Sequence, residues 1–468
     1  MDPTRRPLDA VTARLGLWDA TSIIVGIIIG VGIFKLPSTI FAKAPGPWEA
    51  MGVWALGGLL AFIGALCFAE LASAYPRSGG EYVYLTRACG PGVGFLFAWA
   101  QLAIIRPGSI GGLAYVFAEY ACTCMGWPDV GVMPLAAGAV FVLTVINVLG
   151  VTLGKNTQNL LTVVKILGLG AVIAVGVGWG RWDVPSFERG ASVKPWFADA
   201  MILVLWTYAG WHEAAYIAAE VKNSRRNIPL ALLSGTLVVT AIYLLVNAAY
   251  LFGLGWAGAQ RAGTAADLVM LAWPGAGARA VDVLIMVSAL GATNGMIFTT
   301  ARIYSEFGAD HRLFQPLSHW SRRMGTPVKA LVVQGLISAA MILAVGWWGN
   351  GGQWLEAMIE LTAAVFWGFF FLTGVALFLL RIKDPEVPRP FRVPLYPVLP
   401  LVFCGWCGYM TYGVIAEQPE KSLIGLGLLA AGLPLYFLPT RIRPAAVAAA
   451  PEPVPVGSGA GPKRGQDL

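Results

Sequence analysis

The sequence predicts an all-α membrane protein with 12 transmembrane helices. Only 12% of its 468 residues are charged, and 57% are apolar. A soluble domain carries about 25% charged residues, so most side chains here are expected never to meet water. Apolar runs of roughly 20 residues also recur along the whole chain, and each is long enough to cross a hydrocarbon core about 30 Å thick.

The apolar runs also define the order of the elements. Basic residues precede the first run, which is too long for the apolar part of a signal peptide and is therefore read as a retained span. The third run is overlong, and the tenth contains Glu356 and Glu360. The spans are expected at 17–42, 48–73, 92–122, 132–151, 158–180, 197–219, 229–254, 279–303, 328–348, 355–381, 395–416 and 422–440.

Three parts of the chain follow from these spans. Residues 1–16 form an N-terminal segment, and residues 17–443 form one membrane domain. The tail 444–468 is rich in Pro, Ala and Gly. That composition cannot bury a core, so the tail is predicted to be disordered.

The distribution of positive charge predicts the orientation. An even number of spans places both termini on one side, and loops, span ends and tails on that side hold 22 of the 32 Lys and Arg residues, against seven on the other side. Positive charge accumulates on the cytoplasmic side, so both termini are expected in the cytoplasm of a multi-pass protein of the cell membrane. The net charge of +7 is thus explained by topology and the lipid bilayer, and no nucleic-acid partner is expected.

Two spans contain signals for an interrupted helix. The first has Gly26, Gly30 and Gly32 within a short stretch, and the sixth has Tyr208-Ala209-Gly210-Trp211 near its middle. Each glycine costs a helix about 1 kcal/mol relative to alanine. Spans one and six occupy matched positions in two five-span halves, where interrupted helices indicate a transport site near the bilayer midplane. Glycines that serve close helix packing are the alternative.

An interrupted helix would expose peptide groups that lipid cannot satisfy, so they must face a cavity or a ligand. Free N–H groups and the positive dipole at a helix N-terminus favour a carboxylate, whereas free carbonyls at a C-terminus favour an ammonium group. An α-amino acid carries both groups on one carbon. The pattern therefore predicts a carrier of small amino acids.

At these residues the chain resembles the amino acid–polyamine–organocation superfamily, and within it the L-type amino acid transporters. The resemblance extends in order over nearly the whole membrane portion, and Ile104-Ile105-Arg106-Pro107 favours the L-type branch. The other matching stretches are 24–34, 64–71, 78–82, 208–211, 220–223, 226–229, 294–295 and 389–394.

The resemblance implies a LeuT-like fold, with a 5+5 inverted repeat and two additional helices. It also implies sodium-independent exchange of small neutral L-amino acids by alternating access. The substrate carboxylate would bind near Gly30, Val31 and Gly32, its amino group would bind carbonyls, and Trp206 would cover it. The substrate-binding residues expected are Ile28, Ile29, Gly30, Val31, Gly32, Ile33, Trp206, Tyr208, Ala209 and Gly210.

Lys165 lies inside the fifth span. A lysine at the bilayer centre costs about 2.5–3.5 kcal/mol, so such a residue indicates a function; snorkelling to the cytoplasmic surface is the alternative. In the family that the chain resembles, a lysine here replaces a sodium ion and bridges spans one and eight. Ser288 and Asn294 on span eight are its expected neighbours.

Three residues depart from the family pattern. Val31 stands where serine is usual, which leaves the backbone donors but removes a hydroxyl group. His212 stands where asparagine is common, and it either lines the pocket or is a buried, satisfied histidine. Lys35 either reaches the external surface or attracts an anionic substrate. The second possibility leaves transport of acidic amino acids as an alternative.

Other classes of function remain or are excluded. An enzyme is not expected, because the three histidines form no catalytic pattern. The pairs Cys122/Cys124 and Cys404/Cys407 lack further ligands for a metal site. We expect no cofactor and see no feature for a heavy-chain partner. A proton-coupled symporter, a carrier of cationic amino acids and a transport-dead amino acid sensor stay open.

Overall fold

The computed structural model describes residues 13–128, 131–180, 196–348 and 354–438, and this part of the chain is helical without a strand. Seven helical segments in it are long and apolar enough to cross a membrane. An eighth is the pair α1 (Leu17–Ile28) and α2 (Gly32–Lys43), bent by 45° at its break. The seven are α3 (Pro47–Ala74), α5 with α6 (Pro91–Met125), α8 (Val151–Trp179), α10 (Ser224–Ala259), α12 (Gly277–Asp310), α14 (Trp354–Lys383) and α15 (Val398–Glu417).

The remaining elements are shorter. Three are apolar: α7 (Val132–Val148), α9 (Trp196–Thr207) and α13 (Val328–Trp348). Four further α-helices are α4 (Glu81–Cys89), α11 (Thr264–Met270), α16 (Pro419–Ala430) and α17 (Leu433–Phe437). A π-helix, η2 (Gln101–Ile105), separates α5 (Pro91–Ala100) from α6 (Arg106–Met125), and the 3-10 helices are η4 (Glu213–Glu220) and η5 (Arg312–Ser318).

The prediction of an all-helical membrane protein is confirmed, and within the described residues each expected apolar stretch falls mainly on helix. The fifth stretch starts earlier than expected, at Val151, and the last is divided between α16 and α17. The 12-span count and its inverted repeat stay predictions. The tail 444–468 and nearly all of segment 1–16 lie outside the described residues, as do the side chains of Glu356 and Glu360.

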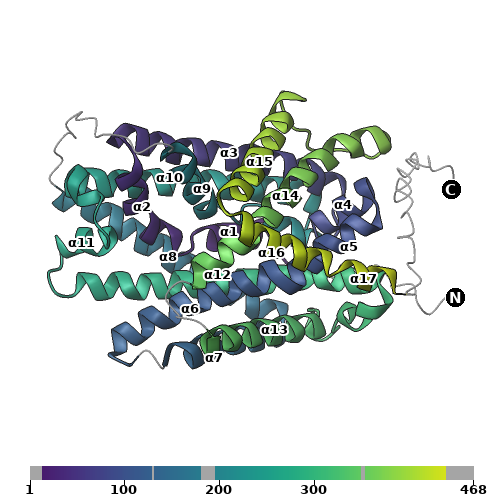
Figure 1. Cartoon of the computed structure of the whole chain (residues 1–468), viewed down its shortest axis with the longest axis horizontal. Coiled ribbons are helices and arrows are strands. Elements are labelled where there is room, and N and C mark those ends of the chain that lie inside the picture. The colour runs from purple at the N-terminus through teal and green to yellow at the C-terminus, as the bar shows by residue number, and fades with distance from the viewer. Residues whose placement is uncertain (1–12, 129–130, 181–195, 349–353, 439–468) are drawn as a thin grey trace, which may run out of the picture.

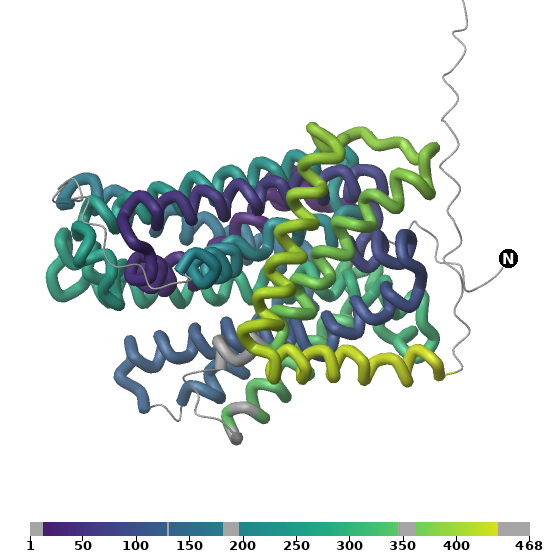
Figure 2. Tube along the Cα trace, turned by 45° about the horizontal axis from the view of Figure 1, so that its top comes forward, coloured from purple at the N-terminus to yellow at the C-terminus, as the bar shows by residue number. Residues whose placement is uncertain are grey.

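The long helices lie side by side, with α4, α5 and α17 at one end of the bundle and α2 and α11 at the other (Figure 1). The view in Figure 2 shows α15 crossing the other long helices steeply. Helix α1 lies against α8, α10 and α12. Its stretch Ser22–Ile28 is buried throughout, as expected for a helix that is apolar on every side.

Candidate substrate site

The two predicted helix breaks are present, and they lie against each other. Helix α1 ends at Ile28 and α2 begins at Gly32, while α9 ends at Thr207 before a turn that leads into η4. Gly210 in that turn has φ +110°, and a Cβ there would lie 2.6 Å from Cγ2 of Ile27. Glycine is required at this position by both backbone conformation and close approach.

The break in the first span leaves peptide donors free. The described hydrogen bonds give the N–H groups of Val31, Gly32 and Ile33 no backbone acceptor. This is the ordinary condition of a helix N-terminus, but here it lies in the middle of the bundle instead of at its surface. Free N–H groups at such a terminus favour an anionic group such as a carboxylate.

Tyr243 on α10 joins the two breaks, and nothing in the sequence had marked it. Its hydroxyl oxygen lies 2.7 Å from the carbonyl oxygen of Ile28 and 3.2 Å from that of Thr207. One hydroxyl can donate one hydrogen, so the two carbonyls share this donor. A tyrosine inside an apolar span is usually expected to serve core packing. Only the positions of the two carbonyls in the structure reveal that the Tyr243 hydroxyl contacts both.

Lys165 is fully buried on α8 and points to the first break. Its Nζ donates to the carbonyl oxygens of Gly26 at 2.6 Å and Ile29 at 2.8 Å. A Cβ on Gly291 of α12 would lie 2.6 Å from Nζ, so the ammonium group also touches α12 closely. The side chain therefore does not snorkel to a surface.

The two expected neighbours of Lys165 lie differently. The hydroxyl of Ser288 is buried and has no hydrogen-bond partner among the described residues. Asn294 accepts from Asn147 at 2.8 Å and donates to Gln158 at 2.9 Å. Asn294 thus ties α12 to α7 and α8, and the described hydrogen bonds of Lys165 go to α1 instead.

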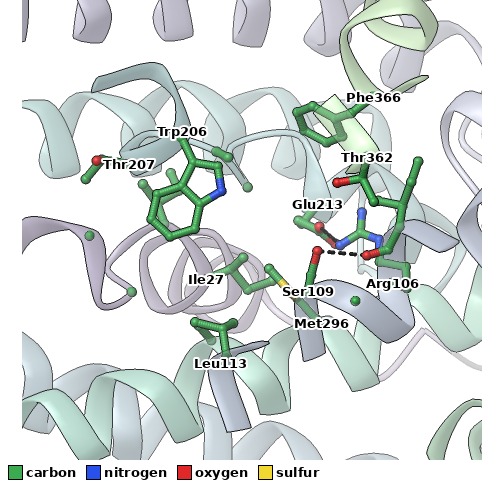
Figure 3. Close-up of a pocket in the computed structure, with 18 of the residues that line it drawn as sticks. Ile27, Arg106, Ser109, Leu113, Trp206, Thr207, Glu213, Met296, Thr362 and Phe366 are labelled. Atoms are coloured by element: carbon green, nitrogen blue, oxygen red, sulfur yellow. Dashed lines mark hydrogen bonds and ion pairs between the residues drawn. The ribbon is translucent and has the colours of Figure 1, made fainter. Parts of the chain in front are cut away.

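A cavity of about 130 Å³ lies between the breaks. Figure 3 shows Trp206 on one side of it and the pair Arg106 and Glu213 on another, with Met296 and Leu113 below. Ile29, Ile33 and Tyr208 are expected site residues that do not line it. The expected residues that do line it are Ile28, Gly30, Val31, Gly32, Trp206, Ala209 and Gly210.

The polar side of the cavity is a buried ion pair. Arg106 follows the π-helix η2 and donates through Nη1 to Glu213, and through Nε to Gln101 at 2.8 Å. Glu213 also accepts from the Thr299 hydroxyl at 2.6 Å. The sequence signal for this pair was an acidic residue directly after Gly210-Trp211-His212 and an arginine within a span, although the two are far apart in the chain.

The residues that depart from the family pattern have definite surroundings. His212 both lines the cavity and is buried, with its Nε2 3.9 Å from Glu213 and its Nδ1 without a partner among the described residues. Lys35 lies 4.0 Å from Glu119 and stacks over the ring of Tyr120. The ammonium group of Lys35 is thereby compensated by a carboxylate of the protein itself.

Comparison with known proteins identifies relatives over almost the whole chain. The model of the amino acid permease family matches residues 15–424. The b(0,+)-type amino acid transporter 1 of Homo sapiens is 32% identical over 442 residues, covering 91% of this chain and 87% of the relative. The serine/threonine exchanger SteT of Bacillus subtilis (strain 168) is 28% identical, covering 91% and 96%. The large neutral amino acids transporter small subunit 2 of Oryctolagus cuniculus is 29% identical, covering 92% and 81%.

Proposed function

The chain belongs to the amino acid permease family, and from this premise we propose that it exchanges small neutral L-amino acids across the cell membrane. It is a membrane transporter and not an enzyme, as its family and relatives are. One relative is named a serine/threonine exchanger, which supports exchange and a small substrate. We propose that substrate moves by alternating access, without sodium.

The observation that carries this proposal is the pair of facing helix breaks around one cavity. The substrate carboxylate would bind the free N–H groups at Gly32 and its neighbours, where the dipole of α2 favours negative charge. The amino group would bind carbonyls at the ends of α1 and α9. Each carbonyl oxygen has two lone pairs, so the Thr207 carbonyl can accept from a substrate as well as from Tyr243, whereas the Ile28 carbonyl already accepts from the Tyr243 hydroxyl and the Gly30 N–H.

The charge balance of the cavity supports a neutral side chain. Arg106 and Glu213 compensate each other, and the Thr299 hydroxyl occupies the second carboxylate oxygen of Glu213. A charged substrate side chain would enter without a free counter-ion, which is costly in a buried site. Lys35 is paired with Glu119, so acidic substrates receive no support from it.

Lys165 supports transport without sodium. Its ammonium group holds two carbonyls of the first break and touches α12. A fixed cation in this place would do permanently what a bound metal cation would do transiently, namely hold α1 and α12 together. We therefore propose that Lys165 is a structural bridge between α1 and α12.

The broader architecture extends this proposal. The paired breaks in α1–α2 and α9–η4 fit a LeuT-like repeat of 12 spans, and the positive charge of the loops supports cytoplasmic termini. We also propose that the chain exchanges amino acids by itself, without a heavy-chain partner. A proton-coupled symporter remains the second candidate, because buried ionisable groups line the cavity.

Exchange in proteoliposomes tests the function. Purified protein is reconstituted alone, and uptake of labelled serine, alanine, leucine, glutamate and arginine is measured with and without internal unlabelled substrate. We expect trans-stimulation by the small neutral amino acids, unchanged when sodium is replaced and with no imposed pH gradient. Uptake that needs sodium or a proton gradient would contradict exchange.

The substitution Lys165→Ala tests the bridge. One hydrogen bond to a charged group is worth about 1.5–3 kcal/mol, so loss of both is expected to lower exchange at least about tenfold. The control is Lys329→Ala, which removes an exposed positive charge at the start of α13. Wild-type exchange by Lys165→Ala, at equal amounts of inserted protein, would overturn the bridging role.

A further inference from the structure

Glu81 is a buried carboxylate for which the transport site has no use. It is the first residue of α4, a helix of nine residues that is too short to span a membrane. The residue is 2% exposed, and its Oε2 has no hydrogen-bond partner among the described residues. A buried charge in that condition is unfavourable, so the group must find either a cation or a proton.

The nearest cation is already committed. Glu81 shares a hydrogen bond with the hydroxyl of Tyr216 on η4, and that hydroxyl accepts from Nη2 of Arg106 at 3.4 Å. Arg106 uses its other N–H groups on Glu213 and Gln101. The cluster thus contains two carboxylates and one guanidinium, and the guanidinium pairs with Glu213.

The elements packed against α4 supply no further cation. Helix α5 has no ionisable side chain, and Tyr84 is the other titratable group on α4 that faces Glu81. The charged groups of α12 and α14 near this end have partners other than Glu81. These are Arg302 with Glu220, Glu306 with Arg77, Asp310 with Tyr82, Arg381 with Glu70, and Lys383 with the Ala88 carbonyl.

The balance of these effects favours the protonated form. Burial, with a smaller contribution from the Glu213 carboxylate, raises the pKa of Glu81 to about 8 against the opposing effects of Tyr216 and Arg106. A glutamate in water has a pKa of about 4.3. The buried group therefore holds a proton at neutral pH that it would lose on exposure to water.

We propose that Glu81 is a proton-binding site that is occupied while the α4 end of the bundle is closed. The closure around it is tight. The Gly79 N–H donates to the Tyr216 carbonyl at 2.9 Å, and a Cβ on Gly80 would lie 2.6 Å from the Tyr216 ring. Opening of this end would separate α4 from η4, admit water to Glu81 and release its proton.

The inference rests on the proposed function, because it takes the α4 end to be the cytoplasmic one. The proton then leaves and returns on the same side of the membrane. Exchange would respond to cytoplasmic pH without carrying protons across, unlike symport. Because the closed form binds the extra proton, acid stabilises closure, and rising pH through about 8 favours opening.

The first test measures the proton directly in the purified wild-type protein. Infrared difference spectra, recorded between about pH 6 and about pH 9, report the C=O stretch of protonated carboxyl groups. We expect a band that is lost on alkalinisation and that is absent in Glu81→Gln. The control Glu306→Gln, which removes a carboxylate paired with Arg77 on the same end, should keep the band. A band that survives in Glu81→Gln would overturn the proposal.

The second test measures exchange over the same pH range, equal on both sides of the vesicle. Wild type and Glu81→Asp should exchange several-fold faster at the alkaline end, whereas Glu81→Gln should stay at the slow acidic rate throughout. A pH profile of Glu81→Gln that matches wild type would overturn the proposal. If wild type moves no amino acid at all, the proposed function fails, and the infrared band still decides whether Glu81 holds a proton.

Discussion

At the scale of single residues, two side chains hold the first break through its carbonyls. Lys165 binds the Gly26 and Ile29 carbonyls, and Tyr243 reaches that of Ile28. These oxygens have lost their helical donors, and a buried carbonyl without a donor is unfavourable. Donors from α8 and α10, together with the Gly30 N–H at the Ile28 carbonyl, therefore stabilise the break in apolar surroundings.

Removal of the Tyr243 hydroxyl tests this account. We expect Tyr243→Phe to lower exchange and thermal stability, because the Ile28 and Thr207 carbonyls lose a donor at a cost of about 1–3 kcal/mol. The matched control is Tyr250→Phe on the same helix, since the Tyr250 hydroxyl is buried without a partner among the described residues. Equal effects of the two substitutions, in exchange and in melting temperature, would refute the role of Tyr243.

At the scale of elements, the site consists of half-helices that meet end to end. Helix α1 stops where α2 starts in a new direction, and α9 gives way to a turn and the 3-10 helix η4. The π-helix η2 makes a third irregularity, directly before Arg106. Such irregular backbone is tolerated at membrane depth where it borders a cavity, which is where all three lie.

The turn after α9 gives the prediction at this scale. Gly210→Ala would hold alanine at φ +110° and press its Cβ against Ile27, a strain of about 1–3 kcal/mol before any clash. We expect lower thermal stability and a loss of exchange. Gly178→Ala on α8, where a Cβ meets nothing within 4 Å, should behave like wild type. A Gly210→Ala protein with full exchange would show that the turn is not held in this conformation.

At the scale of the whole molecule, polar networks close the α4 end of the bundle. Glu70 on α3 accepts from Arg381 at 2.7 and 2.6 Å and from the Val393 N–H at 2.7 Å. Asp384 after α14 accepts from Tyr75 at 2.7 Å and from Arg87 Nη2 at 2.9 Å. These ion pairs and hydrogen bonds thus join helices that are distant in sequence at one end of the bundle. Apolar packing alone would do little to fix the orientation of these helices.

The network at Asp384 predicts a pH dependence of stability. Hydrogen bonds from Arg87 hold the pKa of this carboxyl below its ordinary value. The contribution of the ionised Asp384 to folding stability is therefore present at neutral pH and is lost as pH falls below about 4. Asp384→Asn should lower the melting temperature at neutral pH, and the difference from wild type should disappear in acid. Glu386→Gln, exposed in the same loop, is the control. A difference that persists in acid would contradict the ionic origin.

Much of the site could be predicted because it is local. The glycines of the first span and the stretch Tyr208–Trp211 mark backbone breaks that follow from the residues themselves. Lys165 stood out because a cation inside an apolar span needs a reason. Tyr243 and Glu213 could not be predicted in the same way. Their meaning depends on carbonyls and charges that come from other helices.

The sequence by itself determined an all-helical membrane protein, the positions of its apolar helices and the two breaks, because hydropathy and glycine act along the chain. The tertiary structure alone decided which helices meet at the breaks, that Lys165 bonds to α1 while Asn294 bonds elsewhere, and that no free cation among the described residues lies beside Glu81. Partners of buried polar groups are chosen by packing in three dimensions, where residues from η4, α6, α8 and α10 come together. No pattern along one chain records those distances.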